Sequence, residues 1–471
     1  MRREERIRFA LSIATDTKEF IMGEGVSEKA PSIFRQHFPG RKALILSDVH
    51  TWPALGEKLY GLFRKEGIPV EKYIIDKEEF HADWRYVEMT DHLAEGRFEK
   101  AREVENDPYY KEGSPEGPYG KAEYVLVSVG SGVINDLCKL SSSHHGQSYL
   151  TLPTAASVDG YSSFGASITY GGSKQTFSCP APVAIIADMT VIASAPKEMS
   201  AAGYADLAAK VPAGAEWMIS DFVGTEPIHA DAWHVLQDHL DGFLSNPQGI
   251  AEGDPEAIAD VFEGLTLSGI AMQAARSSRP ASCCDHLFSH ILDMTGWHYK
   301  GKLVSHGFQV AVGTLTMCAV FDQLFRLDLT KLDVERCVQA WPSLEEEQQR
   351  ALELFRDFPL PKLGYTEMTK KYAPKEVVRT ELAKLKAEWP EFREKLRRQV
   401  YPYEKMHALL KASGAPASPQ DIGLTNAQIR DMFPLVQMMR FRYNVLDLAK
   451  RGCFYDEIVS PLFARGGVFE I

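Results

Sequence analysis

Apolar residues in the first part of the chain form short runs that alternate with segments of helical spacing. The runs contain few polar residues and occupy 43–47, 70–75, 124–129 and 148–152. Such runs are typical of strands in a parallel sheet that is covered on both faces. The segments between them, 52–65 and about 85–104, carry apolar residues at helical spacing. This alternation predicts an α/β domain built from βαβ units around a parallel sheet.

The pattern changes twice further along the chain. Residues 105–120 are rich in Pro, Gly, Tyr and charge, which predicts an exposed loop or insertion. Residues 166–177, with Gly171-Gly172 at their centre, predict a β-hairpin. From about residue 197 onward the spacing of apolar residues is helical almost to the end. We therefore expect two domains, an α/β domain over 1–195 and an all-helical domain over 196–471.

Composition and charge narrow the classes of partner. The 471 residues are 45% hydrophobic and 25% charged, and the formal net charge is −12. This acidic balance argues against a general affinity for nucleic acid or anionic membranes, so an anionic ligand must be bound by a local cluster of donors. No run of roughly 18 apolar residues predicts a membrane span, and the charged start Met1-Arg-Arg-Glu-Glu-Arg6 does not resemble a signal peptide. Seven cysteines without a CxxC pair are typical of a cytoplasmic protein with reduced thiols.

A glycine loop follows the apolar run at 124–129. Its sequence is Gly130-Ser-Gly132-Val-Ile-Asn135-Asp136. Glycines allow the backbone to approach a pyrophosphate closely, and the N-terminus of the following helix offers N–H donors to phosphates. The third glycine of the usual GxGxxG pattern is replaced by Asn135, so an ordinary turn between strand and helix is the alternative.

A second polar segment comes one strand later. It places small hydroxyl residues around one carboxylate, at Thr154, Ser157, Asp159 and Ser163. Hydroxyls can hydrogen-bond a cofactor amide or ribose, and a carboxylate can orient a substrate hydroxyl. The alternative is a turn rich in Ser and Thr with an Asp cap.

A carboxylate and two imidazoles further along the chain suggest a metal site. Asp206 lies four positions before Lys210, His286 lies four positions before His290, and His306 begins an apolar helical segment. This donor set suits a divalent metal, and three protein ligands leave a coordination position open for a substrate. By contrast, His144-His145 are expected at the end of a helix and not in a metal site.

The order of these motifs resembles the family of iron-containing alcohol dehydrogenases and dehydroquinate synthases. Within that family the chain is most similar to the bacterial branch of the glycerol-1-phosphate dehydrogenases, over about residues 40–450. The tail motif Arg440-Phe-Arg442-Tyr-Asn-Val contributes to the similarity. The resemblance implies an N-terminal α/β nucleotide-binding domain with a parallel sheet and an all-α metal-binding C-terminal domain, and it is compatible with a homodimer.

The resemblance also implies roles for individual residues. The metal, zinc or nickel, would be bound by Asp206, His286 and His306, with Asp206 also beside the substrate. NAD(P) would be bound by Asp48, Gly130, Gly132, Val133, Ile134, Asn135, Asp136, Thr154, Ser157 and Ser163. Asp159 and His290 would contact the substrate, a small phosphorylated ketone or polyol, and His290 could donate or relay a proton. The implied reaction is the NAD(P)-dependent interconversion of dihydroxyacetone phosphate and sn-glycerol 1-phosphate.

Departures from the family pattern leave other functions open. Asp285 stands where the family has Glu, Cys283-Cys284 replace small residues, and Val211-Pro212 replace polar ones. Because Asp is shorter than Glu, we expect it to support His286 less directly, and we expect Pro212 to kink or restart its helix. The alternatives are a dehydrogenase of glycerol or another small polyol, a lyase of the dehydroquinate synthase kind, and an inactive dinucleotide-binding protein. Asp206 counts against the lyase, for which Glu is expected.

Overall fold

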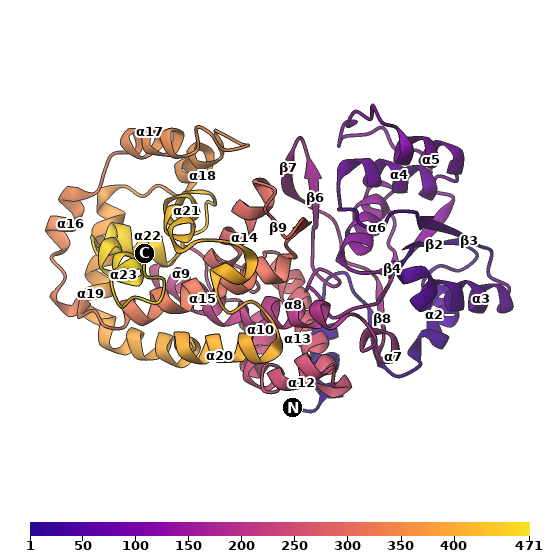
Figure 1. Cartoon of the computed structure of the whole chain (residues 1–471), viewed down its shortest axis with the longest axis horizontal. Helices are drawn as coiled ribbons and strands as arrows, with labels where there is room; N and C mark the ends of the chain where they lie inside the picture. Colours follow the sequence, from indigo (N-terminus) through magenta and orange to yellow (C-terminus); the bar gives the residue numbers. More distant parts are fainter. The chain divides into compact units, whose positions relative to one another are not determined.

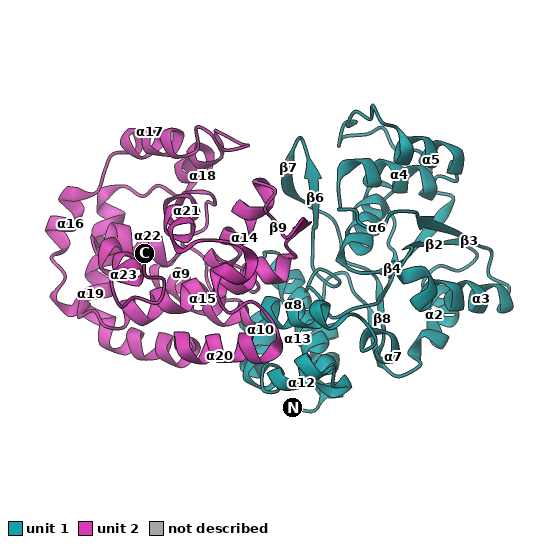
Figure 2. Cartoon of the chain, in the orientation of Figure 1, with its two compact units in different colours: residues 1–207, 230–278 teal, residues 208–229, 279–471 magenta. Residues whose placement is uncertain are grey.

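The computed structural model describes residues 1–172 and 174–471 and divides the chain into two compact units (Figure 2). Unit 1 contains residues 1–207 and 230–278, and unit 2 contains residues 208–229 and 279–471. This division differs from the single boundary expected at residue 195. Helix α13 (Pro255–Ala275) belongs to unit 1, where its buried Glu263 accepts hydrogen bonds from Arg3 and Arg6 of helix α1 (Arg3–Ile13).

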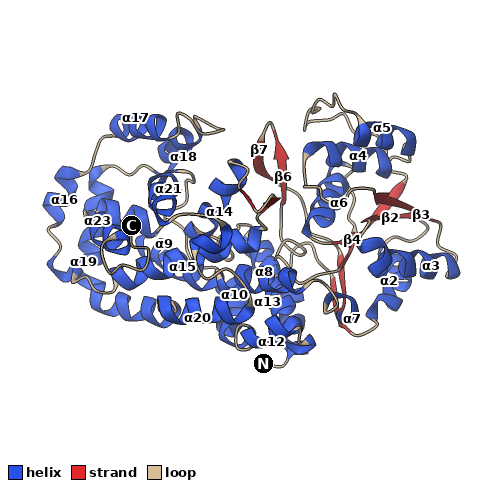
Figure 3. Cartoon of the chain, in the orientation of Figure 1, coloured by secondary structure: helices blue, strands red, loops and turns tan.

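Unit 1 is built on a six-stranded sheet whose strands are all parallel (Figures 1 and 3). Its order is β1-β8-β5-β4-β2-β3. The strands are β1 (Glu19–Gly23), β2 (Lys42–Asp48), β3 (Val70–Ile75), β4 (Tyr124–Gly130), β5 (Leu150–Pro153) and β8 (Ala184–Asp188). The predicted parallel sheet is therefore confirmed. The edge pair β1 and β8 was not predicted.

Apolar residues of the sheet point alternately to two faces. In β2, Leu44 and Leu46 belong to one buried cluster, and Ala43 and Ile45 belong to the other. Helices α4 (Trp84–Ala94) and α6 (Gly132–His144) contribute to the first cluster, and α2 (Ala30–His37) and α3 (Glu57–Lys65) contribute to the second. This burial on both faces explains why the strands read as continuous apolar runs.

Several predicted elements differ from the observed ones in detail. The helix expected over 85–104 is two helices, α4 and α5 (Phe98–Asn106), separated at Gly96, whose φ is 78°. The predicted hairpin is confirmed as β6 (Ala166–Tyr170) paired with the antiparallel strand β7 (Ser173–Phe177). Its turn contains Gly171 and Gly172, both with positive φ, which glycine adopts without strain.

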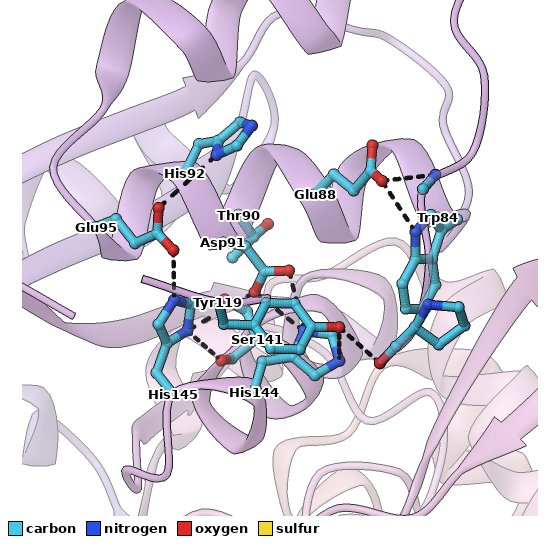
Figure 4. Close-up of polar contacts among 12 residues, drawn as sticks. Trp84, Glu88, Thr90, Asp91, His92, Glu95, Tyr119, Ser141, His144 and His145 are labelled. Carbon is cyan, nitrogen blue, oxygen red and sulfur yellow. Dashed lines mark hydrogen bonds and ion pairs between the residues drawn. The ribbon is translucent and has the colours of Figure 1, made fainter. Parts of the chain in front are cut away.

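The predicted insertion packs against α4 and α6 through its aromatic side chains (Figure 4). Between α5 and β4 the structure has no helix or strand, as expected for a loop. Tyr119 stacks on His144, with ring centroids 4.0 Å apart, and His144 Nδ1 lies 3.0 Å from Asp91. His145 Nε2 lies 3.3 Å from Glu95. The two histidines thus lie at the end of α6, as predicted, and contact Asp91 of α4 and Glu95, the residue that follows α4.

The remaining helices of unit 1 follow the sheet or return to it. They are α7 (Met189–Ile192), α8 (Lys197–Ala208), α10 (Ala230–Leu236), α11 (Leu240–Phe243) and α12 (Pro247–Glu252). Helix α8 ends at Ala208 and α9 (Lys210–Val223) begins two residues later, with Pro212 in its first turn. Proline has no N–H to continue the ladder from α8, so the predicted restart of the helix at this point is confirmed.

Unit 2 is almost entirely helical, as predicted. Besides α9 it contains α14 (Cys284–Met294), α15 (His306–Leu324), α16 (Val334–Ala340), α17 (Leu344–Leu354), α18 (Leu363–Lys371), α19 (Lys375–Gln399), α20 (Tyr403–Ser413), α21 (Asn426–Met438), α22 (Val445–Arg451) and α23 (Tyr455–Phe463). A short hairpin connects α14 to α15, and its strands β9 (His298–Tyr299) and β10 (Lys302–Leu303) have two residues each. Among the described residues, no helix is both long and apolar enough to cross a bilayer.

Candidate active site

The glycine loop lies at the carboxyl end of β4, in the middle of the parallel sheet. Strand β4 ends at Gly130 and α6 begins at Gly132, so the first N–H groups of α6 follow the turn directly. The chain passes from β2 outward to β3 and then returns to β4 on the other side of β2. Ligands of open α/β sheets bind at the carboxyl ends of the strands that flank such a reversal. Asp48 ends β2 and Gly130 ends β4, so both lie at this point.

Both glycines of the loop are required by close packing. A Cβ atom on Gly130 would lie 2.7 Å from the Ile134 side chain, and one on Gly132 would lie 2.9 Å from Val158. Asn135, at the third glycine position, donates from Nδ2 to the Gly160 carbonyl at 3.0 Å and accepts from Tyr149 at 3.0 Å. Its side chain therefore holds the 154–163 segment against α6.

The other residues expected at the nucleotide have polar partners within unit 1. Asp48 accepts from the N–H groups of His50 and Thr51 at 2.9 and 2.8 Å. Asp136 accepts from the Ser167 N–H at 3.1 Å and pairs with Lys139 at 3.3 Å. The remaining hydrogen bonds join Thr154 N–H to Gly130 O at 3.1 Å, Ser157 to Tyr161 at 3.2 Å and Ser163 to Gly160 O at 3.3 Å. Of the two apolar residues in the loop, Val133 is partly exposed and Ile134 is buried. These contacts order the two polar segments that the sequence singled out.

Asp159 and Asp206 lie side by side in unit 1. The Asp159 N–H donates to Asp206 Oδ2 at 3.1 Å, and the Asp159 carboxylate accepts from Ser268 at 3.0 Å. Asp206 is fully buried in α8. Helix α8 approaches this segment closely at Gly203, because a Cβ there would overlap the carbonyl oxygen of Ala156. Asp159 and Asp206, the two residues whose carboxylates were predicted to contact the substrate, are thus close together because Gly203 allows α8 to approach the segment that carries Asp159.

His286 and His306 face one another in unit 2. His286 is in the first turn of α14 and His306 is the first residue of α15. Their ring centroids are 5.4 Å apart, with the rings inclined at 62°. Since the residues are twenty positions apart, the antiparallel packing of α14 on α15 is what places them together.

The contacts of the two rings determine where each carries its proton. Asp285 Oδ2 contacts His286 Nδ1, and because a carboxylate accepts, Nδ1 donates. Ser289 Oγ lies 2.7 Å from Gln309 Oε1 and 3.0 Å from His306 Nδ1. The single hydroxyl proton goes to Gln309, so His306 Nδ1 is also a donor. Both lone pairs are therefore on Nε2, the tautomer that second partners impose on metal-binding histidines.

The contact of Asp285 with His286 corrects one expectation. The shorter carboxylate was expected to support the histidine less directly than Glu would, but it contacts His286 Nδ1 itself. Its second oxygen accepts from the Cys283 N–H at 3.2 Å, which fixes the orientation of the carboxylate.

We predict that Gly313→Ala weakens the His286–His306 pair. A Cβ on Gly313 of α15 would overlap the backbone carbonyl of Asp285 in α14, so the two helices must separate. Overpacking of this kind costs about 1–3 kcal/mol of folding stability. We expect a lower midpoint of thermal unfolding and weaker binding of divalent metal, measured by titration with a metal indicator. Gly242→Ala is the control, because a Cβ there meets no atom within 4 Å; equal metal affinity in both variants would contradict the prediction.

A second group of donor atoms lies behind α14. It consists of Glu216, Cys283 and Cys284, which are all buried. Each offers one possible ligand atom, and these three atoms lie within 4.8 Å of one another. The Glu216 oxygens accept from the N–H groups of Cys284 at 2.8 Å and Val445 at 3.0 Å. Arg279, also buried, donates to Cys283 Sγ at 3.0 Å. Burial raises the pKa of both thiols, so this group is a structural anchor for the start of α14 and of α22.

Several residues of the site were not predicted. Glu216 is the one acidic residue in the apolar stretch Val211-Pro-Ala-Gly-Ala-Glu-Trp-Met-Ile219, and an isolated charge of this kind was the available signal. Ser289 lies one helical turn after His286, which also could have indicated a supporting role. No local pattern pointed to Arg440, whose guanidinium lies 3.4 Å from His290 Nδ1.

The chain is similar to known proteins over parts of its length. Residues 111–196 match the family model described as iron-containing alcohol dehydrogenase. The glycerol-1-phosphate dehydrogenase [NAD(P)+] of Bacillus licheniformis is 33% identical over 216 residues, which cover 46% of this chain and 54% of that protein. The protein of the same name from Halalkalibacterium halodurans is 28% identical over 277 residues, covering 59% of this chain and 64% of that one.

The fold is shared with solved structures over nearly the whole chain. A probable glycerol dehydrogenase from Sinorhizobium meliloti has a TM-score of 0.55 and 16% identity, and the match covers 94% of this chain and 96% of that one. The matched segments span about half to two thirds of the curated relatives, whereas the fold match is nearly complete. The chain is thus similar in sequence to glycerol-1-phosphate dehydrogenases over part of its length, and it shares its fold with the probable glycerol dehydrogenase.

Proposed function

We propose that this chain catalyses the NAD(P)-dependent interconversion of dihydroxyacetone phosphate and sn-glycerol 1-phosphate with the help of one divalent metal ion. The observation that supports this most is the pair His286 and His306, whose Nδ1 atoms are both occupied by supporting acceptors. Such a pair is preorganised to bind a metal through Nε2. The homologues named glycerol-1-phosphate dehydrogenase indicate the substrate.

The metal ligands in this proposal are Asp206, His286 and His306. Asp206 is buried, and its Oδ2 accepts from the Asp159 N–H. Two neutral imidazoles and one carboxylate fit zinc and nickel alike. A divalent metal bound there would polarise the ketone and stabilise the negative charge that develops during hydride transfer.

The nucleotide binds, in this proposal, at the carboxyl ends of β2 and β4. The N-terminus of α6 and the backbone of residues 130–136 offer N–H groups to the pyrophosphate. Asp48, at the end of β2, is placed to accept from the adenosine ribose. Val133, Ile134 and Asn135 take part through their backbone, since the side chains of Ile134 and Asn135 are buried.

His290 is proposed to supply the proton to the substrate oxygen. Arg440 has only donors, so its contact with His290 Nδ1 requires that nitrogen to be the acceptor. The ring proton of neutral His290 is then on Nε2. In this tautomer Nε2–H would relay a proton to the substrate oxygen when the ketone is reduced, and a proton from solvent would restore the neutral ring.

The test of the proposed function is a comparison of two ketones. Metal-loaded protein is mixed with NADH or NADPH and either dihydroxyacetone phosphate or dihydroxyacetone, and oxidation of the nucleotide is followed by absorbance. Turnover with the phosphate ester alone, and sn-glycerol 1-phosphate as the product by chiral analysis, is the expected result. Faster turnover with dihydroxyacetone would favour a polyol dehydrogenase, and no turnover with either would contradict the proposal.

We predict that Asp159→Asn lowers turnover by about 10- to 100-fold, the range expected when a group that orients a substrate is lost. The amide retains the size of the side chain and can still accept from Ser268, so folding is preserved. Binding of NAD(P)H, measured by fluorescence titration, should stay within twofold of the unmodified protein. A variant that loses nucleotide affinity but turns over normally at saturating nucleotide would show that Asp159 serves the cofactor.

A further inference from the structure

Arg440 and Arg442 lie on a short segment whose backbone is held by buried contacts of unit 2. The segment connects α21 to α22 (Figure 1). The Phe441 N–H donates to Glu367 at 2.9 Å, and the Tyr443 carbonyl accepts from Arg279 at 2.8 Å. Ser220 and Glu216 bind its C-terminal end, at Tyr443 O and the Val445 N–H. The two arginines are therefore carried by a fixed backbone, which is what a preorganised binding site needs.

Arg440 carries a charge that no carboxylate neutralises directly. Among the described residues, no carboxylate oxygen lies within 4.0 Å of its guanidinium nitrogens, and its hydrogen-bond contact is His290 Nδ1 at 3.4 Å. Glu367, the acid whose field acts on it, is already bonded to Lys370 at 2.6 Å and to the Phe441 N–H. Burial lowers the pKa of the Arg440 guanidinium, and Glu367 opposes the shift. A desolvated cation of this kind gains from an anionic ligand.

Arg442, two residues after Arg440, adds a second positive charge to the same segment. Burial lowers the pKa of its guanidinium, Glu226 opposes the shift, and the neighbouring charges of Arg279 and Arg440 add to it. Glu226 also faces Arg279, at 3.4 Å. Both Arg440 and Arg442 are partly exposed, and a ligand can reach them. This is a local cluster of donors in a chain whose net charge is −12.

We propose that Arg440 and Arg442 bind the phosphate group of the substrate next to His290. The proposal rests on the proposed function, because it assigns the part of that site which distinguishes a phosphorylated ketone from an unphosphorylated one. A phosphomonoester carries about −1.5 to −2 charges at neutral pH, which two guanidinium groups match. The planar fork of Arg440 offers paired N–H donors to two phosphate oxygens. The contact with His290 brings the phosphate site to the proton donor.

The direct test uses inorganic phosphate as the probe and needs no turnover. Its affinity for metal-loaded protein is measured by isothermal titration calorimetry, for the unmodified chain and for Arg440→Gln, Arg442→Gln and Arg430→Gln. Arg430 is exposed on α21 and pairs with Asp431 at 2.9 Å, so it is the matched control. We expect at least a tenfold loss of phosphate affinity in Arg440→Gln, a smaller loss in Arg442→Gln, and none in the control. Equal phosphate affinity in all four proteins, or no phosphate binding by the unmodified chain, would overturn the proposal.

A second measurement separates this proposal from the proposed function. Arg440→Gln should raise the KM for dihydroxyacetone phosphate by tenfold or more, whereas the affinity for NADH should stay within twofold of that of the unmodified chain. If Arg440→Gln does not fold, Arg440→Lys keeps the charge without the fork and should show an intermediate phosphate affinity. Phosphate binding that depends on Arg440 in a protein without activity would refute the dehydrogenase proposal and leave the anion site standing. Full activity with an unchanged KM in Arg440→Gln would refute the anion site and leave the dehydrogenase proposal standing.

Discussion

Replacing His306 by alanine is expected to remove most of the bound divalent metal and to reduce turnover by roughly 1,000-fold. The factor corresponds to about 4 kcal/mol of lost stabilisation of the transition state, within the range that a metal supplies to a developing charge. In the unmodified chain Ser289 and Gln309 hold His306 so that its lone pair is on Nε2. Alanine removes this proposed ligand and leaves His286 without its neighbouring ring.

Metal content is measured by inductively coupled plasma mass spectrometry after dialysis, alongside nucleotide binding and thermal unfolding. Nucleotide binding should be unchanged, because the residues proposed to hold the nucleotide are all in unit 1. His298→Ala is the matched control, since His298 is exposed and contacts only the carbonyl of Gly296 among the described residues. Retention of one metal ion per chain by His306→Ala would remove this residue from the site.

The second large effect is expected from Glu216→Ala, which should lower the free energy of unfolding of unit 2 by about 3–5 kcal/mol. The buried carboxylate accepts from the N–H groups of Cys284 and Val445, at the N-termini of two helices. Alanine leaves both donors buried without an acceptor, and each such donor costs about 1–3 kcal/mol. Burial raises the pKa of Glu216, so we attribute the loss to the two hydrogen bonds and not to a charge at the helix N-termini.

The loss is measured by urea denaturation followed by circular dichroism. Glu216→Gln keeps the size and one acceptor oxygen but turns an amide donor toward the other N–H, so we expect a smaller loss than with alanine. Glu391→Ala, at an exposed residue of α19, should leave the midpoint of unfolding unchanged. A Glu216→Ala protein as stable as this control would show that the two N–H groups find other acceptors.

A structural role for Glu216 also predicts a change at the metal site. Glu216 accepts a hydrogen bond from the Cys284 N–H, and Asp285 and His286 follow Cys284 directly in α14. When that contact is lost, the first turn of α14 is free to fray. The Glu216→Ala protein should therefore bind metal more weakly at temperatures well below its unfolding midpoint.

Much of unit 1 could be predicted from local patterns. The continuous apolar runs identified four of the six strands, because a strand buried on both faces needs apolar residues at every position. The glycine loop and the hairpin turn were recognisable because glycine is required locally, by close approach at Gly130 and by positive φ at Gly171. Strands β1 and β8 were not predicted: β8 has the same apolar character as the recognised strands, whereas β1 lies at the edge of the sheet and is mostly only partly buried.

The sequence by itself therefore determined the fold class and the position of the glycine loop, since these depend on residues close together in the chain. Only the tertiary structure decided the contacts among distant residues. It placed Glu263 beside Arg3 and Arg6, which assigns α13 to unit 1, and Arg440 beside His290, 150 residues away. Such contacts arise from the packing of helices. The apolar faces of different helices are too alike in sequence to show which of them pack together. For that reason the spacing of residues along the chain carries no information about which polar side chains meet.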